Sequence, residues 1–382
     1  MQQLKSYKLI DSEKKLKELV VRGQVSIIYI HGTARSGSTI AEIILTQLAD
    51  LAIHQPFRGT LDKSGGYLRD NKLNFDFDIY ELGCSLIVDR ITEHLLERDK
   101  VTVVIKELAG FFNPYLWQRW IEIPDRFLFT IREPHLQYFS WLSAMTDKAF
   151  RGNGSLLGNR RLVLDRALGM ENRVLSSEWK GTTISCNQTA WQALKDDFMA
   201  VEEVAFRSNK KVAVLDSILL RYRGELAIKG LVDRLELNLD SLKVIDPNNL
   251  SATKSKILDV RDKTRPMVRK ANTSQKIMPL RKKEVIELSA FPSHSQEHIK
   301  SIIPLYLDLF YSIKLLSMPS LLELETSDLI KINPFITYAI AWFHLNNKMA
   351  THNWCNALAK AKNFKINKFQ VSLNTIDRYW LG

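Results

Sequence analysis

The sequence predicts an α/β fold in which a buried parallel sheet is covered by helices on both faces. Four apolar, β-branched runs have the composition of buried parallel strands, and they begin at Val25, Val101, Arg126 and Lys211. Segments with a helical spacing of apolar residues separate these runs. This alternation is typical of parallel sheets, because each parallel connection needs a crossover that is usually a helix.

The individual elements follow from apolar periodicity and from turn residues. Asp11 is a candidate N-cap and Gly23 a stop for the first helix, and Pro56 interrupts an extended segment over 51–57. The pattern predicts strands over 25–30, 101–105, 126–131 and 211–216, and helices over 11–22, 40–49, 78–98, 191–208 and 219–237. Two polar, glycine-containing segments, 58–77 and 152–181, are interpreted either as loops that shape a substrate pocket or as plain surface loops.

The chain of 382 residues divides into three predicted parts. We expect an α/β core over residues 1–250, a basic connecting segment over 251–295 and a helical C-terminal extension over 296–382. The connecting segment is marked by eleven Lys or Arg against two acids within 251–283. Amphipathic helical patterns with short breaks define the extension, in which no residues suggest chemistry.

The stretch after the first strand predicts an anion site. A strand, a tight turn over 32–39 and a helix aim backbone N–H groups and the positive end of the helix at one point, which suits a phosphate or sulfate. The spacing of Gly32 and Gly37 resembles a Walker A loop, but Ser38 stands where nucleoside triphosphatases need a lysine. A cation lies inside the loop instead, at Arg35.

A second motif follows the strand over 126–131. Arg132 comes directly after this strand, Pro134 suits the first turn of a helix, and Ser140 lies eight residues after Arg132. Ligands of open parallel sheets bind beyond the carboxyl ends of the strands. We therefore expect Arg132 to point at the same crevice as Arg35, although about 97 residues separate them in the sequence.

Taken together, the two motifs resemble those of the sulfotransferase family, whose members use 3′-phosphoadenosine 5′-phosphosulfate and have a P-loop-like α/β core. The resemblance covers roughly residues 24–240. It implies that the 5′-phosphosulfate group is bound by Arg35, Ser36, Gly37, Ser38 and Thr39. It also implies that Arg132 and Ser140 bind the 3′-phosphate of the same donor, through a charge-assisted contact and a hydroxyl group.

The resemblance further implies the transfer of a sulfuryl group to a hydroxyl or amine acceptor. Negative charge grows on the leaving phosphate, so a fixed cation and backbone donors there stabilise the transition state, and no metal is required. Arg35 would act only electrostatically, because arginine does not donate its proton at neutral pH. Lys106 falls where many members of the family have a lysine that contacts the sulfuryl group or the acceptor; its alternative role is a surface lysine at a strand end.

An acceptor hydroxyl also needs a general base. Some relatives place a glutamate in the segment after the first helix, just before a proline, and here Gln55 occupies that position. The nearest titratable candidates are His54, Glu107 and Asp216, of which we favour His54 because it adjoins the family's position. Because Gln55 replaces the glutamate of those relatives, a second interpretation is a protein that keeps the nucleotide site but has weak or lost catalysis.

The composition is that of a globular protein with a basic surface. A net charge of +12 and a pI near 9.4 favour anionic partners, such as a polyphosphorylated cofactor or an acidic substrate. The cysteines Cys84, Cys186 and Cys355 show no paired spacing, which argues against a disulfide framework or a zinc site. Because there is no apolar signal core and no run of about 18 apolar residues, we expect a soluble, cytoplasmic protein without a transmembrane segment.

Other functions remain as alternatives. A P-loop kinase is opposed by Ser38 in the position of the Walker lysine and by the lack of a clear aspartate pair for magnesium. A non-catalytic nucleotide or anion binder is favoured by Gln55. A nucleic-acid-binding module would rest only on the basic segment at 251–283, which carries no recognition motif, so we expect no nucleic-acid partner. Saccharide, lipid, phenol and small-molecule amine acceptors all fit the sequence, as does any oligomeric state.

Overall fold

The computed structural model describes the predicted core and a few positions beyond it. The described residues are 9–32, 35–57, 75–108, 114–134, 136–137, 209–222, 224–238, 245–246 and 256–259, with single positions at 195, 198–199, 201, 204, 277, 297, 299, 301–303, 305–306 and 309. Ser140, the segment 152–181 and most of the predicted C-terminal extension lie outside these residues.

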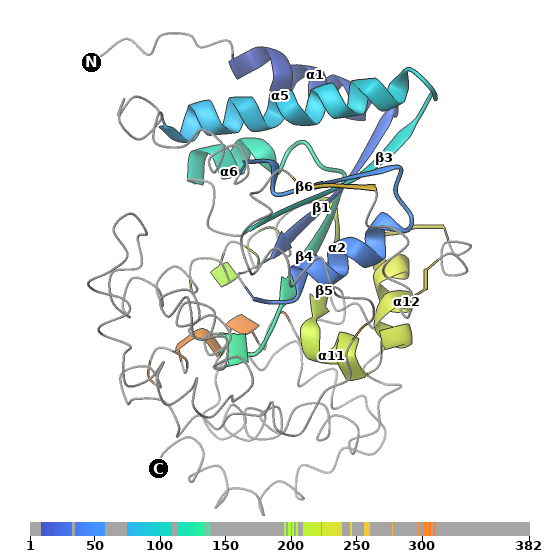
Figure 1. Ribbon diagram of the computed structural model, residues 1–382. Coiled ribbons are helices and arrows are strands. Elements are labelled where there is room, and N and C mark those ends of the chain that lie inside the picture. Colours follow the sequence, from blue (N-terminus) through green and yellow to red (C-terminus); the bar gives the residue numbers. More distant parts are fainter. Residues whose placement is uncertain are drawn as a thin grey trace, which may run out of the picture.

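The described core is built on a sheet of six strands that are all parallel (Figure 1). Its order is β5-β4-β1-β3-β2-β6, so β1 lies at the centre between β3 and β4. This arrangement confirms the predicted α/β fold with a parallel sheet. The strands are β1 (Val25–Gly32), β2 (Leu51–His54), β3 (Val101–Leu108), β4 (Arg126–Ile131), β5 (Lys211–Asp216) and β6 (Ile257–Asp259).

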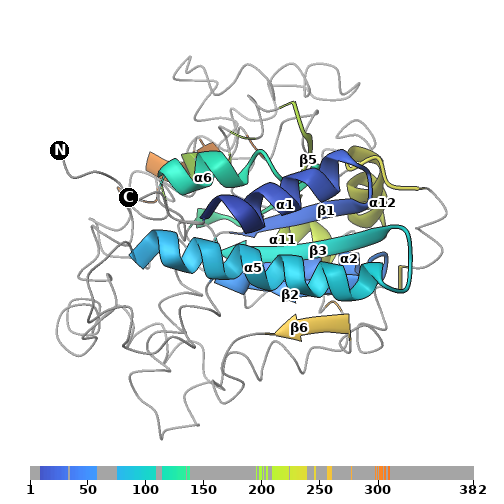
Figure 2. The same ribbon diagram turned by 90° about the horizontal axis from the view of Figure 1, so that it is seen from above.

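Helices form a layer on each face of the sheet (Figures 1 and 2). One layer holds α1 (Leu9–Val21), α5 (Phe75–Leu95) and α6 (Pro114–Trp120), and the other holds α2 (Ser38–Thr46), α11 (Ser217–Tyr222) and α12 (Gly224–Arg234). Because both faces are covered, the strands can be apolar throughout their length, as the sequence pattern indicates.

Side-chain alternation along β1 shows how one strand serves two cores. Ile28 and Ile30 belong to the buried cluster that contains the apolar residues of α2 and α12. Tyr29 points to the other face, where its ring packs edge-on against Trp120 of α6 at 5.4 Å and against Phe127 of β4 at 5.7 Å. Aliphatic residues therefore fill one side of the sheet and aromatic residues contribute much of the other.

Several boundaries differ from the sequence predictions. The strand predicted over 101–105 continues to Leu108, because its parallel pairing with β1 extends through Lys106 and Glu107 to Gly32. The helix predicted over 219–237 is two helices, since α11 ends at Tyr222 and α12 begins at Gly224, a residue of low helix propensity. Three other predicted helices shift by a few residues: α1 begins at Leu9, α2 spans 38–46, and α5 spans 75–95, so the predicted loop over 58–77 ends in helix. Most of the helix predicted over 191–208 lies outside the described residues.

The basic segment and the predicted extension both contact the sheet where they are described. β6 lies inside the basic segment and pairs in parallel with β2, from Ala52 to His54. Farther along, Ile299, Ile302 and Tyr306 are buried, and the Tyr306 hydroxyl donates a hydrogen bond of 3.0 Å to Asp216 at the end of β5. These contacts add to the core, and the predicted division at residue 250 stays a prediction. None of the described helices is long and apolar enough to cross a membrane.

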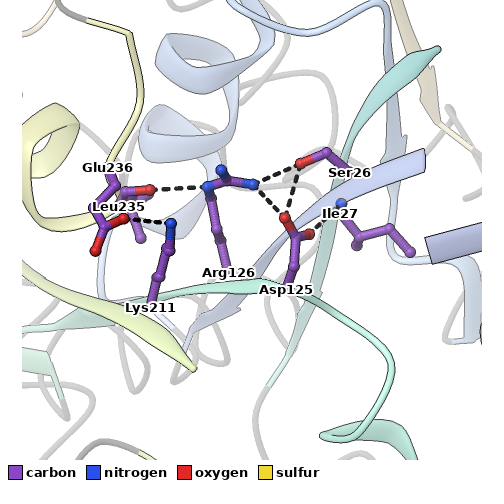
Figure 3. A network of polar contacts seen from close by, with 7 residues as sticks. All are labelled: Ser26, Ile27, Asp125, Arg126, Lys211, Leu235 and Glu236. Carbon is purple, nitrogen blue, oxygen red and sulfur yellow. Dashed lines mark hydrogen bonds and ion pairs between the residues drawn. The ribbon is translucent and has the colours of Figure 1, made fainter. Parts of the chain in front are cut away.

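We call the edge at which β1, β4 and β5 begin the amino edge of the sheet, and it is held by a polar network (Figure 3). Asp125 accepts hydrogen bonds from the backbone N–H of Ile27 at 2.6 Å and from the Ser26 hydroxyl at 2.9 Å. Arg126 pairs with Asp125 and donates to the backbone carbonyl of Leu235, which follows α12, at 2.8 Å. These bonds fix the start of β4 against β1 and the end of α12.

Candidate active site

The opposite edge of the sheet, the carboxyl edge, holds the loop that the sequence singles out. After β1 the chain enters α2 on one face of the sheet, whereas after β3 it enters α6 on the other face (Figure 1). The loops that follow these adjacent strands therefore diverge, and such a switch point opens a crevice beyond the carboxyl ends of the strands. Arg35 and the residues up to Thr39 lie just beyond the carboxyl end of β1, at this switch point, whereas Thr33 and Ala34 are outside the described residues.

The backbone at the start of α2 has a conformation that allows an anion to come close to it. Gly37 is the N-cap, with φ 97° and ψ 7°, a left-handed conformation that glycine adopts without strain. The first backbone bonds of the helix run from the N–H groups of Ile40 and Ala41 to the Gly37 carbonyl at 3.0 and 3.3 Å. The N–H groups of Ser38 and Thr39 precede them, at the positive end of the helix dipole, where anions bind favourably.

Tight packing fixes the loop against its neighbours. A Cβ added at Gly32 would lie 2.4 Å from the Cβ of Ser38 and 2.7 Å from the Thr130 hydroxyl, so only glycine fits there. The hydroxyls of Ser36 and Thr130 are 2.6 Å apart and both residues are buried, so the loop is joined to β4. Of the predicted loop residues, Ser36 and Ser38 are buried, Gly37 and Thr39 are half-buried, and Arg35 is exposed.

The two predicted arginines lie side by side. Arg132 Nη1 is 3.5 Å from the backbone carbonyl oxygen of Arg35, at the long limit for a hydrogen bond, although 97 residues separate the two in sequence. Arg35 has φ 70°, an unusual conformation for a residue with a side chain. The Arg132 side chain thus reaches the loop that contains Arg35, whereas Ser140 lies outside the described residues.

His54 and Lys106 meet on the face of the sheet that α2 covers. They are register partners across β2 and β3, and Lys106 is also the partner of Ile30 in β1. Both residues are 2% exposed, so Lys106 is not a surface lysine at a strand end. Neighbouring parallel strands are about 4.8 Å apart, so the side chains of His54 and Lys106 leave the sheet side by side on this face.

A third buried group, which the sequence analysis missed, contacts His54. The Glu42 carboxylate, from α2, makes a close hydrogen-bonded contact with Nδ1 of His54. Glu42 is 1% exposed. The signal in the sequence is a single carboxylate on an otherwise apolar helix face, and only the fold shows which strand that face meets.

Gln55 has a strained backbone. It stands where some members of the family that the motifs resemble have a glutamate. Its φ is 51°, and its N–H donates to the Lys106 carbonyl at 2.6 Å. A left-handed residue other than glycine costs about 1–2 kcal/mol. A strained residue persists only where the surrounding structure holds it in place, and such residues cluster at functional sites.

The other two candidate bases lie on the opposite face. Lys106 points toward α2, so alternation along β3 turns Glu107 to the other face, where its carboxylate accepts the Phe57 N–H at 3.1 Å. Asp216 pairs in register with Ile131, next to the loop-facing Thr130, so it also lies on the opposite face. Neither carboxylate shares a face with His54 or Lys106.

A pair of buried carboxylates marks the ends of β4 and β5. Glu133 is 5% exposed and Asp216 is fully buried. Burial, and then the proximity of Asp216, raise the pKa of Glu133 well above its usual range, and Arg132 opposes this shift. The pair therefore lies directly beside the predicted 3′-phosphate arginine.

No protein-family model matches the chain, and no curated protein matches its sequence. Among the described residues, no group of three or more His, Cys, Asp or Glu side chains could hold a metal ion. The arrangement of residues at the carboxyl edge is therefore the basis for a functional proposal.

Proposed function

We propose that the protein is a sulfotransferase that moves a sulfuryl group from 3′-phosphoadenosine 5′-phosphosulfate to a hydroxyl or amine acceptor. One observation carries the proposal: the arginine after β4 reaches the backbone of the arginine in the loop after β1. The donor carries phosphate groups on both the 5′ and the 3′ side of its ribose. An arginine side chain that reaches an arginine-containing loop at a helix N-terminus suits such a molecule.

In this proposal, the loop binds the 5′-phosphosulfate and Arg132 binds the 3′-phosphate. The backbone N–H groups at the start of α2 and the Arg35 side chain would stabilise the charge that grows on the leaving phosphate. Ser140 would add a hydroxyl to the 3′-phosphate contact, as the resemblance implies. We also propose that the α/β core is P-loop-like and of sulfotransferase type, and that the enzyme is soluble and cytoplasmic.

The reaction requires one proton to leave the acceptor. The acceptor oxygen or nitrogen forms a bond to sulfur while the bond between sulfur and the bridging oxygen breaks, and its electron pair stays on the 5′-phosphate. Lys106 would contact the sulfuryl group or the acceptor from β3. His54 would take the proton as general base, because it shares a face with Lys106 whereas Glu107 and Asp216 do not.

The test is a calorimetric titration with adenosine 3′,5′-bisphosphate, beside ADP and ATP with magnesium. We expect the bisphosphate to bind at least tenfold more tightly than ATP, a difference of about 1.4 kcal/mol. In Arg132→Ala, binding of the bisphosphate should weaken by about 1.5–3 kcal/mol while adenosine 5′-phosphate binding changes little, because one charge-assisted contact is lost.

A surface variant serves as the matched control. Arg22 is exposed at the end of α1, so Arg22→Ala removes the same charge without touching the carboxyl edge and should leave both affinities unchanged. Equal losses for the two nucleotides in Arg132→Ala would contradict the 3′-phosphate assignment. Tighter binding of ATP with magnesium would favour a kinase instead.

A further inference from the structure

The contact between Glu42 and His54 calls for an explanation beyond packing. Glu42 lies on the face of α2 that buries Ala41, Ile44 and Leu45, and these three residues are 0% exposed. Burying an ionised carboxylate among apolar side chains is costly unless it is paired. An apolar residue at this position would fill the same space without that cost.

The geometry of the pair is that of a carboxylate supporting an imidazole. The oxygen Oε2 of Glu42 contacts Nδ1 of His54, from a helix one turn beyond the anion-binding loop. A hydrogen bond from Nδ1–H to a carboxylate fixes the imidazole tautomer, places the basic lone pair on Nε2 and makes the ring more basic. The same helix therefore carries the loop at its start and the support for His54 in the next turn.

We propose that Glu42 is a positioning residue that holds His54 with its proton on Nδ1, so that Nε2 can accept the proton of the acceptor during sulfuryl transfer. This inference rests on the proposed function. In the step, the acceptor proton moves to Nε2 as its oxygen or nitrogen bonds to sulfur and the bridging oxygen leaves with the electron pair. Glu42 stays ionised and stabilises the imidazolium that forms.

Two charged residues are register neighbours of His54 on the adjacent strands. Lys106 is the register partner of His54 on β3, and a cation there opposes a proton on the imidazole in the resting state. Asp259 is the register partner on β6.

The decisive experiment reads the tautomer of His54 in the unaltered full-length protein. Long-range proton–nitrogen correlation spectra of protein labelled with ¹⁵N-histidine distinguish protonated from unprotonated ring nitrogens, and His54→Gln identifies the signal among the eight histidines. We expect a protonated Nδ1 and an unprotonated Nε2 at neutral pH. A proton on Nε2 alone, or on both nitrogens, would overturn the proposal.

A variant links the tautomer to the chemistry. Glu42→Gln keeps the size of the side chain but removes its charge, so kcat should fall about 10–100-fold and the acidic limb of the kcat–pH profile should move to lower pH. The Kd of adenosine 3′,5′-bisphosphate should stay unchanged, and Glu42→Asp should restore part of kcat. An unchanged kcat and pH profile in Glu42→Gln would overturn the positioning role.

The two proposals can fail separately. If the bisphosphate does not bind while His54 shows the expected tautomer, the sulfotransferase proposal is wrong and the pair remains as a supported base for another reaction. If the bisphosphate binds and the tautomer is reversed, the donor site stands and Glu42 has only a structural role. His94 of α5, whose Nδ1 lies 3.0 Å from the Arg90 carbonyl, is an internal reference that neither variant should perturb.

Discussion

Each edge of the sheet has a hydrogen-bonded pair of ionisable side chains, but the two pairs differ in how deeply they are buried. At the amino edge, Asp125 and Arg126 bond to each other and to the backbone, and their side chains are 32% and 18% exposed. At the carboxyl edge, Glu42 and His54 are also bonded to each other, but their side chains are only 1% and 3% exposed.

The difference shows where charge is retained at a cost in stability. The groups at the amino edge stay partly hydrated while they hold strand ends, so their desolvation penalty is smaller. Full burial at the carboxyl edge brings a desolvation penalty that an ion pair does not reliably offset. Groups kept under that penalty, beside a loop with strained backbone at Arg35 and Gln55, are the better candidates for function.

The largest predicted effect is a loss of activity on substitution at the carboxyl edge, without a matching loss at the amino edge. We expect Arg35→Ala to lower kcat about 10²–10³-fold, with a smaller change in donor affinity, because charge builds beside it in the transition state. Arg126→Ala should instead lower the free energy of unfolding by about 1–3 kcal/mol and leave kcat unchanged, since its partners lie at the amino edge. Steady-state kinetics and urea denaturation check both; a change confined to donor binding in Arg35→Ala would count against its role.

Alanine substitution of two glycines, Gly32 and Gly23, compares the stability of the chain near the two edges. Gly32→Ala should cost about 3 kcal/mol, because its Cβ would lie 2.4 Å from that of Ser38. Gly23, before the amino edge, has φ 68° with no atom within 4 Å of an added Cβ, so Gly23→Ala should cost only about 1 kcal/mol of backbone strain. Equal costs by chemical denaturation would show that the loop relaxes around the added methyl group.

The smallest effect concerns two glutamates with opposite pH dependence. Burial, followed by Asp216, raises the pKa of Glu133, so the folded state retains a proton that the unfolded state loses. Glu133 therefore lowers stability as pH rises above its unfolded pKa, by at most about 1.4 kcal/mol per pH unit, and Glu133→Gln should flatten this fall.

Glu122 provides the opposite sign. The hydrogen bond from Lys17 lowers the pKa of this exposed carboxylate, so its contribution is present above the unfolded pKa and lost as pH falls through the folded one. Because solvent screens the pair, Glu122→Gln should change stability only slightly at neutral pH. Denaturation at several pH values between 4 and 9 checks both; a loss of stability at pH 8 in Glu133→Gln would contradict the assignment for Glu133.

The strands β1, β3, β4 and β5, and the placement of the two motifs at the ends of β1 and β4, could be predicted from the sequence. The runs that became β1 and β4 are apolar and β-branched, and residues at the ends of parallel strands gather at one edge, so the meeting of Arg35 and Arg132 was expected. The role of Ser140 stays a prediction.

The partners within the site could not be predicted, because they depend on strand order. That His54 lies beside Lys106 follows from β2 pairing with β3, and that Glu42 meets His54 follows from the seating of α2 on the sheet. The three-residue strand β6 has lysines just before it and no alternating pattern, so local sequence gives no sign of it.

The strand order has a consequence for how the chain is assembled. β2, which carries His54, is flanked on its outer side by β6, about 200 residues later in the sequence. Until that segment has been synthesised, the backbone N–H and C=O groups of Ala52 and His54, which point away from β3, form an open sheet edge that can pair with another chain. The nascent protein thus carries its candidate catalytic histidine on an unprotected edge, and late arrival of β6 closes it.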